Sequence, residues 1–90
     1  MIIPIHGLKY YEFSQPLIGD EVILLKEKDN LFDPKAIAAF NNLNQQLGYI
    51  GARSNYNKKV YSKMLTKSVK GKIWSVSKSQ ILVEIEADSF

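Results

Sequence analysis

Two short clusters of the chain combine aromatic rings with charged or amide side chains, a combination that suits the binding of unpaired nucleic-acid bases. The first cluster is Lys9, Tyr10 and Tyr11, in which a cation precedes two aromatic residues. Exposed aromatic rings stack on unpaired bases at about 1–3 kcal/mol for each base, while neighbouring lysine or arginine side chains contact phosphates. The first cluster therefore has the residue types of a single-strand binding site.

The second cluster runs from Asn30 to Asp33 and places the ring of Phe32 beside an amide and a carboxylate. Asp33 is informative because a carboxylate repels phosphate, so in a nucleic-acid site it must accept a hydrogen bond, for instance from a sugar hydroxyl. The alternative is structural, with Phe32 in the core and Asp33 as the N-cap of a turn that begins at Pro34. Taken alone, the second cluster favours the structural alternative.

Most catalytic and metal sites need residues that this chain lacks. His6 is the only histidine and there is no cysteine, which excludes disulfides, cysteine nucleophiles, thiolate metal sites and a histidine-based metal cage. The five glycines are scattered and form no phosphate-binding loop. A position at a sheet edge is the ordinary explanation of His6. We therefore expect a protein that is not an enzyme and that uses no cofactor and no metal.

Hydrophobic patterning and turn residues predict a mostly β fold with one main helix. We expect six short strands, over residues 1–11, 21–28, 36–41, 45–50, 69–77 and 81–87, with a hairpin turn at 41–44. The main helix spans about 54–66, with Ser54 as its N-cap, and a short helical turn lies near 34–37. Short connections imply an antiparallel sheet, and covering both faces of the apolar second strand favours a small β-barrel.

Three sequence features predict which side chains face the core. The last strand alternates, with these side chains inward: Ile81, Val83, Ile85 and Ala87. The helix carries one apolar stripe, made of Tyr56, Val60, Tyr61, Met64 and Leu65. Trp74 suits a core position better than the alternative, an aromatic wall of a binding site.

Length and composition indicate a single globular domain over residues 1–90. The chain is 46% hydrophobic and 23% charged, which is typical of a folded domain. Its apolar runs are far too short to span a membrane, and its N-terminus lacks the pattern of a secretory signal. A small domain without cysteine is typical of intracellular proteins. We therefore expect a cytoplasmic protein without a membrane partner.

Charge is distributed unevenly along the chain. Residues 51–80 contain no Asp or Glu but eight basic residues, which are Arg53, Lys58, Lys59, Lys63, Lys67, Lys70, Lys72 and Lys78. This basic segment could attract a polyanion. It also fits a lysine-rich helix and hairpin that are simply exposed to solvent. Charge alone leaves both interpretations open.

Three motifs together resemble one known family. They are Gly7-Leu8-Lys9-Tyr10-Tyr11, Asp29-Asn30-Leu31-Phe32-Asp33-Pro34-Lys35-Ala36-Ile37 and Gln46-Leu47-Gly48-Tyr49-Ile50. Their order and spacing resemble the HIRAN domain, over nearly the whole chain from residue 3 to 86. HIRAN domains occur at the N-termini of fork-remodelling DNA translocases and also alone in bacteria and phages, and this chain looks like a stand-alone member.

The resemblance implies an OB-like β-barrel that binds the free 3′ end of single-stranded DNA. In the best-studied members two aromatic residues sandwich the terminal base, and Tyr10 and Phe32 stand at the matching positions. Asp33 matches an acid that accepts a hydrogen bond from the terminal 3′ hydroxyl. Lys9 matches a basic residue that contacts phosphate.

The remaining matches are looser. Asn30 corresponds to a polar residue beside the base, and Tyr49 to a residue that lines the site. Arg53 stands one place later than the basic residue that the family carries after Tyr-Ile. Phe32 replaces a tyrosine and loses its hydroxyl, and Lys35 replaces an asparagine. The translocase motor is missing, so the resemblance implies no fork remodelling.

We therefore expect a module that captures the 3′ end of single-stranded DNA, in DNA repair or processing, with other DNA-processing proteins as further partners. Two alternatives stay open. One is a protein-interaction module in which the pocket is degenerate, and the other is single-strand DNA or RNA binding without end specificity. The sequence does not determine the oligomeric state.

Overall fold

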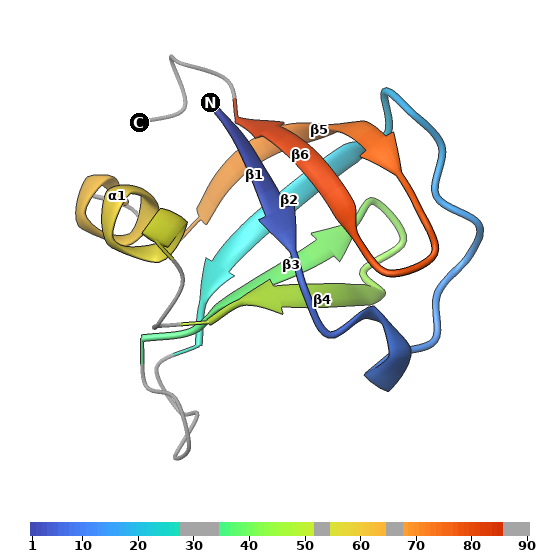
Figure 1. Cartoon of the computed structure of the whole chain (residues 1–90), viewed down its shortest axis with the longest axis horizontal. Coiled ribbons are helices and arrows are strands. Elements are labelled where there is room, and N and C mark those ends of the chain that lie inside the picture. Colours follow the sequence, from blue (N-terminus) through green and yellow to red (C-terminus); the bar gives the residue numbers. More distant parts are fainter. Residues whose placement is uncertain (28–34, 52–54, 65–67, 86–90) are drawn as a thin grey trace.

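Six antiparallel strands form one curled sheet in the computed structural model of the chain, which describes residues 1–27, 35–51, 55–64 and 68–85. The strands are β1 (Ile2–Ile5), β2 (Glu21–Lys26), β3 (Ile37–Asn41), β4 (Gln46–Ile50), β5 (Ser68–Val76) and β6 (Ile81–Ile85). They are hydrogen-bonded in the order β1-β6-β5-β2-β3-β4 (Figure 1). A 3₁₀ helix, η1 (Leu8–Tyr10), follows β1, and one α-helix, α1 (Asn55–Lys63), follows β4.

The two edge strands of the sheet approach each other just beyond the end of β1. The backbone N–H of His6 donates to the carbonyl of Tyr49 at 3.0 Å, and the N–H of Tyr49 donates to the carbonyl of His6 at 2.9 Å. Gly48 permits this approach, because a Cβ there would overlap the carbonyl oxygen of His6. The sheet is therefore a curled half-barrel, which confirms the predicted mostly β, antiparallel fold and is consistent with an OB-like barrel.

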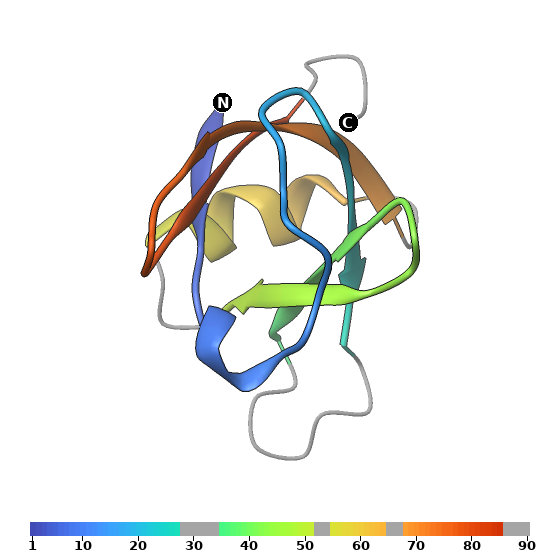
Figure 2. The ribbon, with the colours of Figure 1, turned by 90° about the vertical axis from the view of Figure 1, so that its right-hand side faces the viewer.

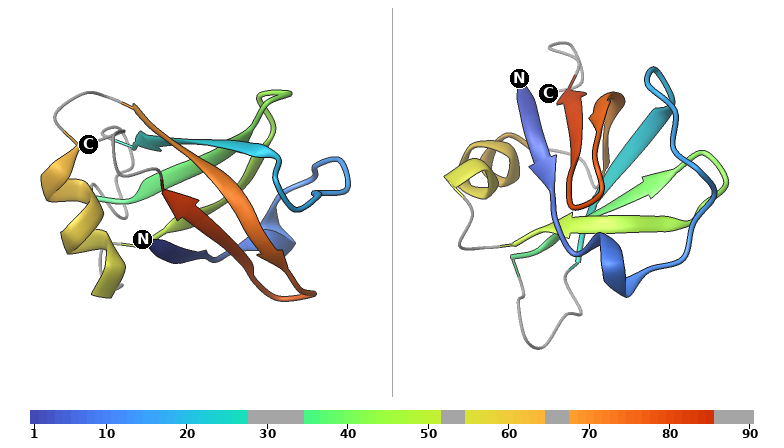
Figure 3. Two further views of the ribbon diagram at one scale, coloured as in Figure 1. Left: turned by 90° about the horizontal axis from the view of Figure 1, so that it is seen from above. Right: turned by 45° about the vertical axis from the view of Figure 1, so that its right-hand side comes forward.

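The curled sheet has two dissimilar ends. α1 lies across one end, while the turn between β5 and β6 lies at the other (Figure 3). Residues 11–20 connect η1 to β2 and run along the outside of the sheet, on the side away from α1 (Figure 2). Within the described residues, no helix is both long and apolar enough to cross a membrane.

The core fills the inside of the curled sheet. Side chains from all six strands and from α1 contribute to it, among them Ile3, Val22 and Leu24, which are fully buried. Burying an aliphatic side chain of this size contributes about 1.5–3 kcal/mol, so this buried face is a main source of the stability of the sheet. Val60 of α1 and Met64, which directly follows the helix, belong to the same cluster, and Tyr61 packs against it. The predicted helical stripe is thus confirmed at these three residues, while Tyr56 and Leu65 lie outside the described side chains.

The predicted hairpin turn at residues 41–44 and the pairing of the last two strands are both found in the structure. In the first, the Asn41 side-chain oxygen accepts hydrogen bonds from the N–H groups of Leu43 (3.0 Å) and Gln45 (2.9 Å). Asn44 has a φ of 62°, a conformation that asparagine tolerates better than most residues. In the last strand the predicted inward residues are buried and Glu84 is exposed, as far as residue 85; Ala87 lies outside the described residues.

Two predicted elements at the ends of strands have the wrong bounds. The first strand stops at Ile5 rather than at Tyr11, because Gly7 has a φ of 78° and turns the chain into η1. The short turn predicted near 34–37 does not reach Ile37, which is the first residue of β3 and pairs with Lys26, although Lys35 does lie in a turn. Pro34 lies outside the described residues.

The predicted core position of Trp74 is also wrong. Trp74 is 52% exposed on the outer face of β5. The register of β5 against β6 shifts between Ile73 and Ser75, so Trp74 is an extra residue in this strand pair. Trp74 is nevertheless exposed in phase with Lys70 and Lys72, whereas Val69 and Ile73 are buried, so alternation along β5 already places it on the outer face.

Candidate functional site

Three of the predicted site residues line one pocket of the structure. The pocket has a volume of ≈ 340 Å³, and its lining includes Lys9, Tyr10 and Tyr49. The other lining residues are Gly7, Leu8, Lys78 and Ser79. This terminal pocket therefore lies where η1 meets the end of β4 and the turn between β5 and β6.

Gly7 sets the position of η1 against Tyr49. A Cβ at Gly7 would overlap the Tyr49 ring, reaching to 3.0 Å from Cδ1 and 3.2 Å from Cζ. The positive φ of Gly7 is one that side chains rarely adopt, and its carbonyl accepts the hydrogen bond from Tyr10 N–H at 3.0 Å that closes the 3₁₀ turn. Only glycine can therefore satisfy both the turn and the close approach of the ring.

Tyr10 presents a free aromatic surface with a cation next to it. The side chain is 69% exposed, the largest exposure of an aromatic ring among the described residues. The Nζ of Lys9 lies 5.2 Å from the centroid of the Tyr10 ring, within the range of a cation–π interaction. A ring held beside an ammonium group combines a surface for a base with a charge for its phosphate.

Tyr11, which follows Tyr10 in the chain, lies in a different environment. It is half-buried, and burial, together with the neighbouring Glu27 and Tyr49, raises the pKa of its hydroxyl. Gln46 donates a side-chain hydrogen bond to the same Glu27 at 3.1 Å. Of the two adjacent tyrosines, Tyr10 is exposed and available to a ligand, whereas Tyr11 is half-buried.

The other predicted site residues lie outside the described residues. They are Asn30, Phe32, Asp33 and Arg53, and their positions relative to the terminal pocket stay predictions. The described flanks of the second cluster are fixed, since Glu27 N–H donates to the carbonyl of Ala36 at 2.9 Å. The buried side chain of Asn57, on α1, donates to the carbonyls of Lys35 (2.8 Å) and Ile50 (3.2 Å).

Lys78 and Ser79 were not among the predicted site residues. They form the turn between β5 and β6, which is closed by hydrogen bonds from the backbone N–H and the hydroxyl of Ser77 to the Gln80 carbonyl, at 2.9 and 3.0 Å. The only sequence signal for Lys78 was its place in the basic segment. Lys78 lies close to η1 because the sheet curls and so brings together residues that are far apart in the chain.

The terminal pocket is electropositive in its described lining. Two lysines, Lys9 and Lys78, contribute to it, and none of the described lining residues is an Asp or Glu. The described part of the chain also contains no group of three His, Cys, Asp or Glu side chains that could hold a metal ion. The described lining therefore offers stacking surfaces, hydroxyls and positive charge.

Comparisons with known proteins give one match. No curated protein and no solved structure matches the chain. The family model of the HIRAN domain matches residues 1–87 of the 90-residue chain. Because this match covers nearly the whole sequence, the chain belongs to the HIRAN domain family.

Proposed function

We propose that this HIRAN domain captures the free 3′ end of single-stranded DNA. The observation that carries the proposal is the common pocket of Lys9, Tyr10 and Tyr49, which come from two distant motifs of the sequence. Membership of the HIRAN family supports a nucleic-acid partner. The end of a strand is the ligand that fits best, because it offers a terminal base to stack and a terminal hydroxyl to recognise.

Each group in the proposed site has one role. Tyr10 stacks on one face of the terminal base and Phe32 on the other, while Tyr49 forms the wall of the pocket. Lys9 and Arg53 contact phosphate. The roles of Phe32 and Arg53 rest on the family motif, whereas those of Tyr10, Lys9 and Tyr49 are also supported by exposure and position. Stacking contributes about 1–3 kcal/mol for each base.

Asp33 gives the proposed site its specificity. Its carboxylate accepts a hydrogen bond from the 3′ hydroxyl, and Asn30 lies beside the base. The carboxylate would repel a terminal phosphate at the same place.

We further propose that the domain is a binding module without catalytic activity, that it acts in the cytoplasm in DNA repair or processing, and that it cooperates with other DNA-processing proteins.

The test compares strands that differ only at their 3′ terminus. Fluorescence anisotropy measures the binding of a labelled single strand with a 3′ hydroxyl and of the same strand with a 3′ phosphate. Asp33→Ala should weaken binding of the hydroxyl strand by about 1.5–3 kcal/mol, the value of a hydrogen bond to a charged group. The same variant should bind the phosphate strand as well as the parent does, or better, since a repulsion has been removed.

Controls on the same assay separate recognition from folding. Loss of an N-cap at Asp33 would by itself cost about 1 kcal/mol of stability, so urea unfolding of the variant is measured in parallel. Tyr10→Ala should lose the stacking energy, while Tyr10→Phe keeps the ring and should bind like the parent. If folded Asp33→Ala binds both strands equally well, Asp33 is structural and end capture is the wrong mechanism.

A further inference from the structure

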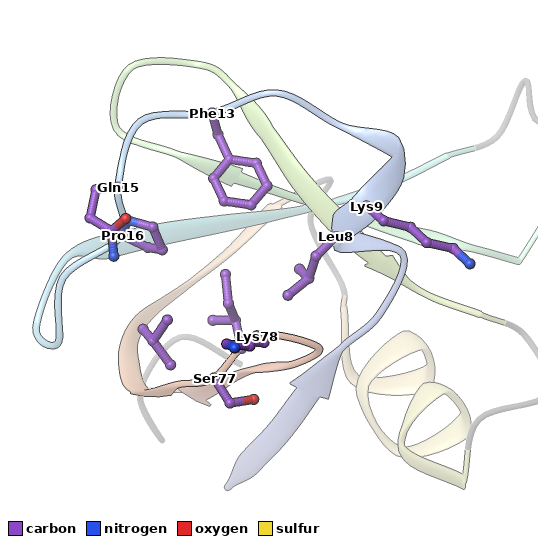
Figure 4. A pocket seen from close by; sticks show the side chains of 9 residues that line it. Leu8, Lys9, Phe13, Gln15, Pro16, Ser77 and Lys78 are labelled. Atoms are coloured by element: carbon purple, nitrogen blue, oxygen red, sulfur yellow. The ribbon is translucent and has the colours of Figure 1, made fainter.

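The hollowed side of the domain, around η1, is separate from a second exposed surface on the outside of β5. Beside the terminal pocket lies another pocket of ≈ 420 Å³, into which Leu8 and Phe13 project (Figure 4). Leu8, Lys9 and Lys78 line both pockets, so both belong to the region of the proposed strand-end site. Trp74, which is 52% exposed on the outer face of β5, lines neither of them. The proposed function therefore leaves this exposed ring without a role.

Trp74 belongs to the hairpin face, an outer surface formed by four side chains of β5 and β6. They are Lys72 and Trp74 of β5 and Leu82 and Glu84 of β6, and Lys72 lies directly opposite Glu84 in the strand pair. Leu82 is half-buried, and the other three side chains are exposed. Among the described elements, no other helix or strand lies over β5 and β6 in the left view of Figure 3. The hairpin face is therefore an uncovered sheet surface that contains a large aromatic ring.

The turn that precedes β2 adds two exposed apolar side chains beside the hairpin face. Leu17 and Ile18 are 62% and 74% exposed. The N–H of Gly19 donates to the carbonyl of Ile73 at 2.8 Å, and the N–H of Ile73 donates to the carbonyl of Asp20 at 2.9 Å. These two hydrogen bonds hold the turn directly beside β5. Because the turn is already fixed, covering its apolar side chains costs little ordering of the chain, which favours association.

The charges of the hairpin face disfavour DNA as its partner. Lys72 lies between two carboxylates, because it pairs with Glu21 of β2 on one side and with Glu84 of β6 on the other. Both glutamates are exposed, so they would repel a phosphate that approaches Lys72. Tryptophan, in contrast, is enriched among the residues that contribute most to binding between proteins. The hairpin face therefore suits a protein surface better than a nucleic acid.

The hairpin face is complementary to itself under two-fold symmetry. A symmetric dimer uses the same surface twice, so that two different residues meet in reciprocal pairs. A two-fold axis parallel to the strands, between β5 and β6, places β5 of one copy over β6 of the other. Because Lys72 and Glu84 lie at the same level of the hairpin, each lysine then faces the glutamate of the second copy. Trp74 likewise faces Leu82 of the second copy, since Leu82 pairs with Ser75, the next residue along β5.

We propose that the hairpin face binds a second copy of this chain, in a symmetric dimer with two reciprocal contacts between Lys72 and Glu84. Trp74 and the apolar side chains beside it supply the affinity, because burial of apolar surface drives association. The two charge contacts fix the register of the two sheets, which is what complementary charges commonly do in an interface. No residue of the hairpin face lines the terminal pocket, so the dimer carries two such pockets.

Sedimentation velocity of the whole chain measures this dimer, at protein concentrations from about 1 µM to about 1 mM, the range of weak to moderate association. The parent protein should shift from monomer to dimer across this range. Because Trp74 is the only tryptophan, its fluorescence reports on this face alone, and its emission should move to shorter wavelengths as the dimer forms. A monomer at every concentration overturns the proposal and would leave the hairpin face to a different protein.

Trp74→Ser tests the apolar centre of the interface. It should weaken dimerisation about tenfold or more, as the loss of a central tryptophan typically does. Leu43→Ser is the matched control, since Leu43 is 64% exposed but lies in the turn between β3 and β4. Leu43→Ser should dimerise like the parent. Equal weakening by the two substitutions, or no weakening by Trp74→Ser, overturns the proposal.

Charge reversal tests the two-fold arrangement itself. Lys72→Glu and Glu84→Lys, each studied alone, should weaken dimerisation about tenfold or more, because like charges then face each other across the axis. An equimolar mixture of the two variants should form a heterodimer, because both contacts across the axis then join opposite charges. Mixing cannot repair a folding defect within either chain, and urea unfolding of each variant shows whether it is folded. Single variants that dimerise like the parent, or a mixture of folded variants that stays as monomeric as its components, would overturn the proposal.

Discussion

Replacing Gly7 with alanine tests whether the contact between the η1 turn and Tyr49 sets the shape of the terminal pocket. The substitution has two separate consequences in the structure. It places a side chain at a φ of 78°, and it places a Cβ inside the space of the Tyr49 ring. Gly19 offers a control for the first consequence alone, because its φ is 94° and nothing lies within 4 Å of a Cβ built there.

The expected magnitudes follow from these two geometries. A left-handed backbone conformation costs a residue with a side chain about 1–2 kcal/mol, so Gly19→Ala should lower the free energy of unfolding by about that amount. Gly7→Ala adds the overlap with Tyr49, and overfilling a packed site typically costs about 1–3 kcal/mol. Gly7→Ala should therefore cost about 2–5 kcal/mol in total, within the stability of an average domain.

Urea unfolding of four proteins separates the contact from the backbone strain. The parent, Gly7→Ala, Tyr49→Ala and the double variant form a double-mutant cycle. Removing the Tyr49 ring should relieve the overlap, so that Gly7→Ala costs less in the Tyr49→Ala background, and the coupling energy should be about 1–3 kcal/mol. In the anisotropy assay the folded Gly7→Ala protein should also bind single strands more weakly, because the ring that forms the pocket wall must move.

Two results would refute this reasoning. If Gly7→Ala and Gly19→Ala destabilise the domain equally, the Tyr49 ring has room to move and the contact does not position η1. If the coupling energy is zero while Gly7→Ala still costs more, the additional strain lies in the backbone rather than in the ring. Either outcome would mean that Gly7 does not determine the position of the Tyr49 ring in the pocket wall.

Three further predictions concern the stability and charge of the domain. Asn57→Ala leaves the carbonyls of Lys35 and Ile50 without their donor and should lower the free energy of unfolding by about 1–3 kcal/mol in urea. The raised pKa of Tyr11 in the folded state means that its contribution to stability is complete below about pH 10 and is lost as the pH rises through the raised pKa. Tyr11→Phe should therefore lose less stability than the parent in urea titrations above pH 10. For binding, contact with two or three phosphates predicts a slope of log affinity against log salt of about −1.4 to −2.1, and a slope beyond about −5 would contradict end capture.

The arrangement of the strands could be predicted because their signals are local. Alternation in the last strand predicted its buried face, and the turn chemistry of residues 41–44 predicted the first hairpin, which the side-chain hydrogen bonds of Asn41 and the positive φ of Asn44 stabilise. The error in the first strand arose because a distant contact decides the local conformation, since Gly7 turns the chain against Tyr49. The error at Trp74 has another origin: the residue lies on the same exposed face of β5 as Lys70 and Lys72, so alternation along the strand predicts its position better than its residue type does.

The residues of the candidate site could be predicted only in part. The family motifs identified Lys9, Tyr10 and Tyr49, which lie together in the structure. The motif could not identify Lys78, since its position beside η1 depends on how far the sheet curls. Nor does the pair of adjacent tyrosines reveal by itself that Tyr10 faces solvent and that Tyr11 is half-buried.

The described lysine side chains of the basic segment do not form one continuous binding surface. Lys58 is exposed on α1, whereas Lys78 lies in the turn at the opposite end of the curled sheet (Figures 1 and 3). Lys70 and Lys72 are exposed on β5 and do not line the terminal pocket. Of these described lysines only Lys78 lines the terminal pocket, so the others add little to the salt dependence of the affinity for a strand end. The remaining lysines still contribute to the long-range field that attracts a polyanion. Their removal should slow association more than it weakens the complex, while removal of Lys78 should do the reverse.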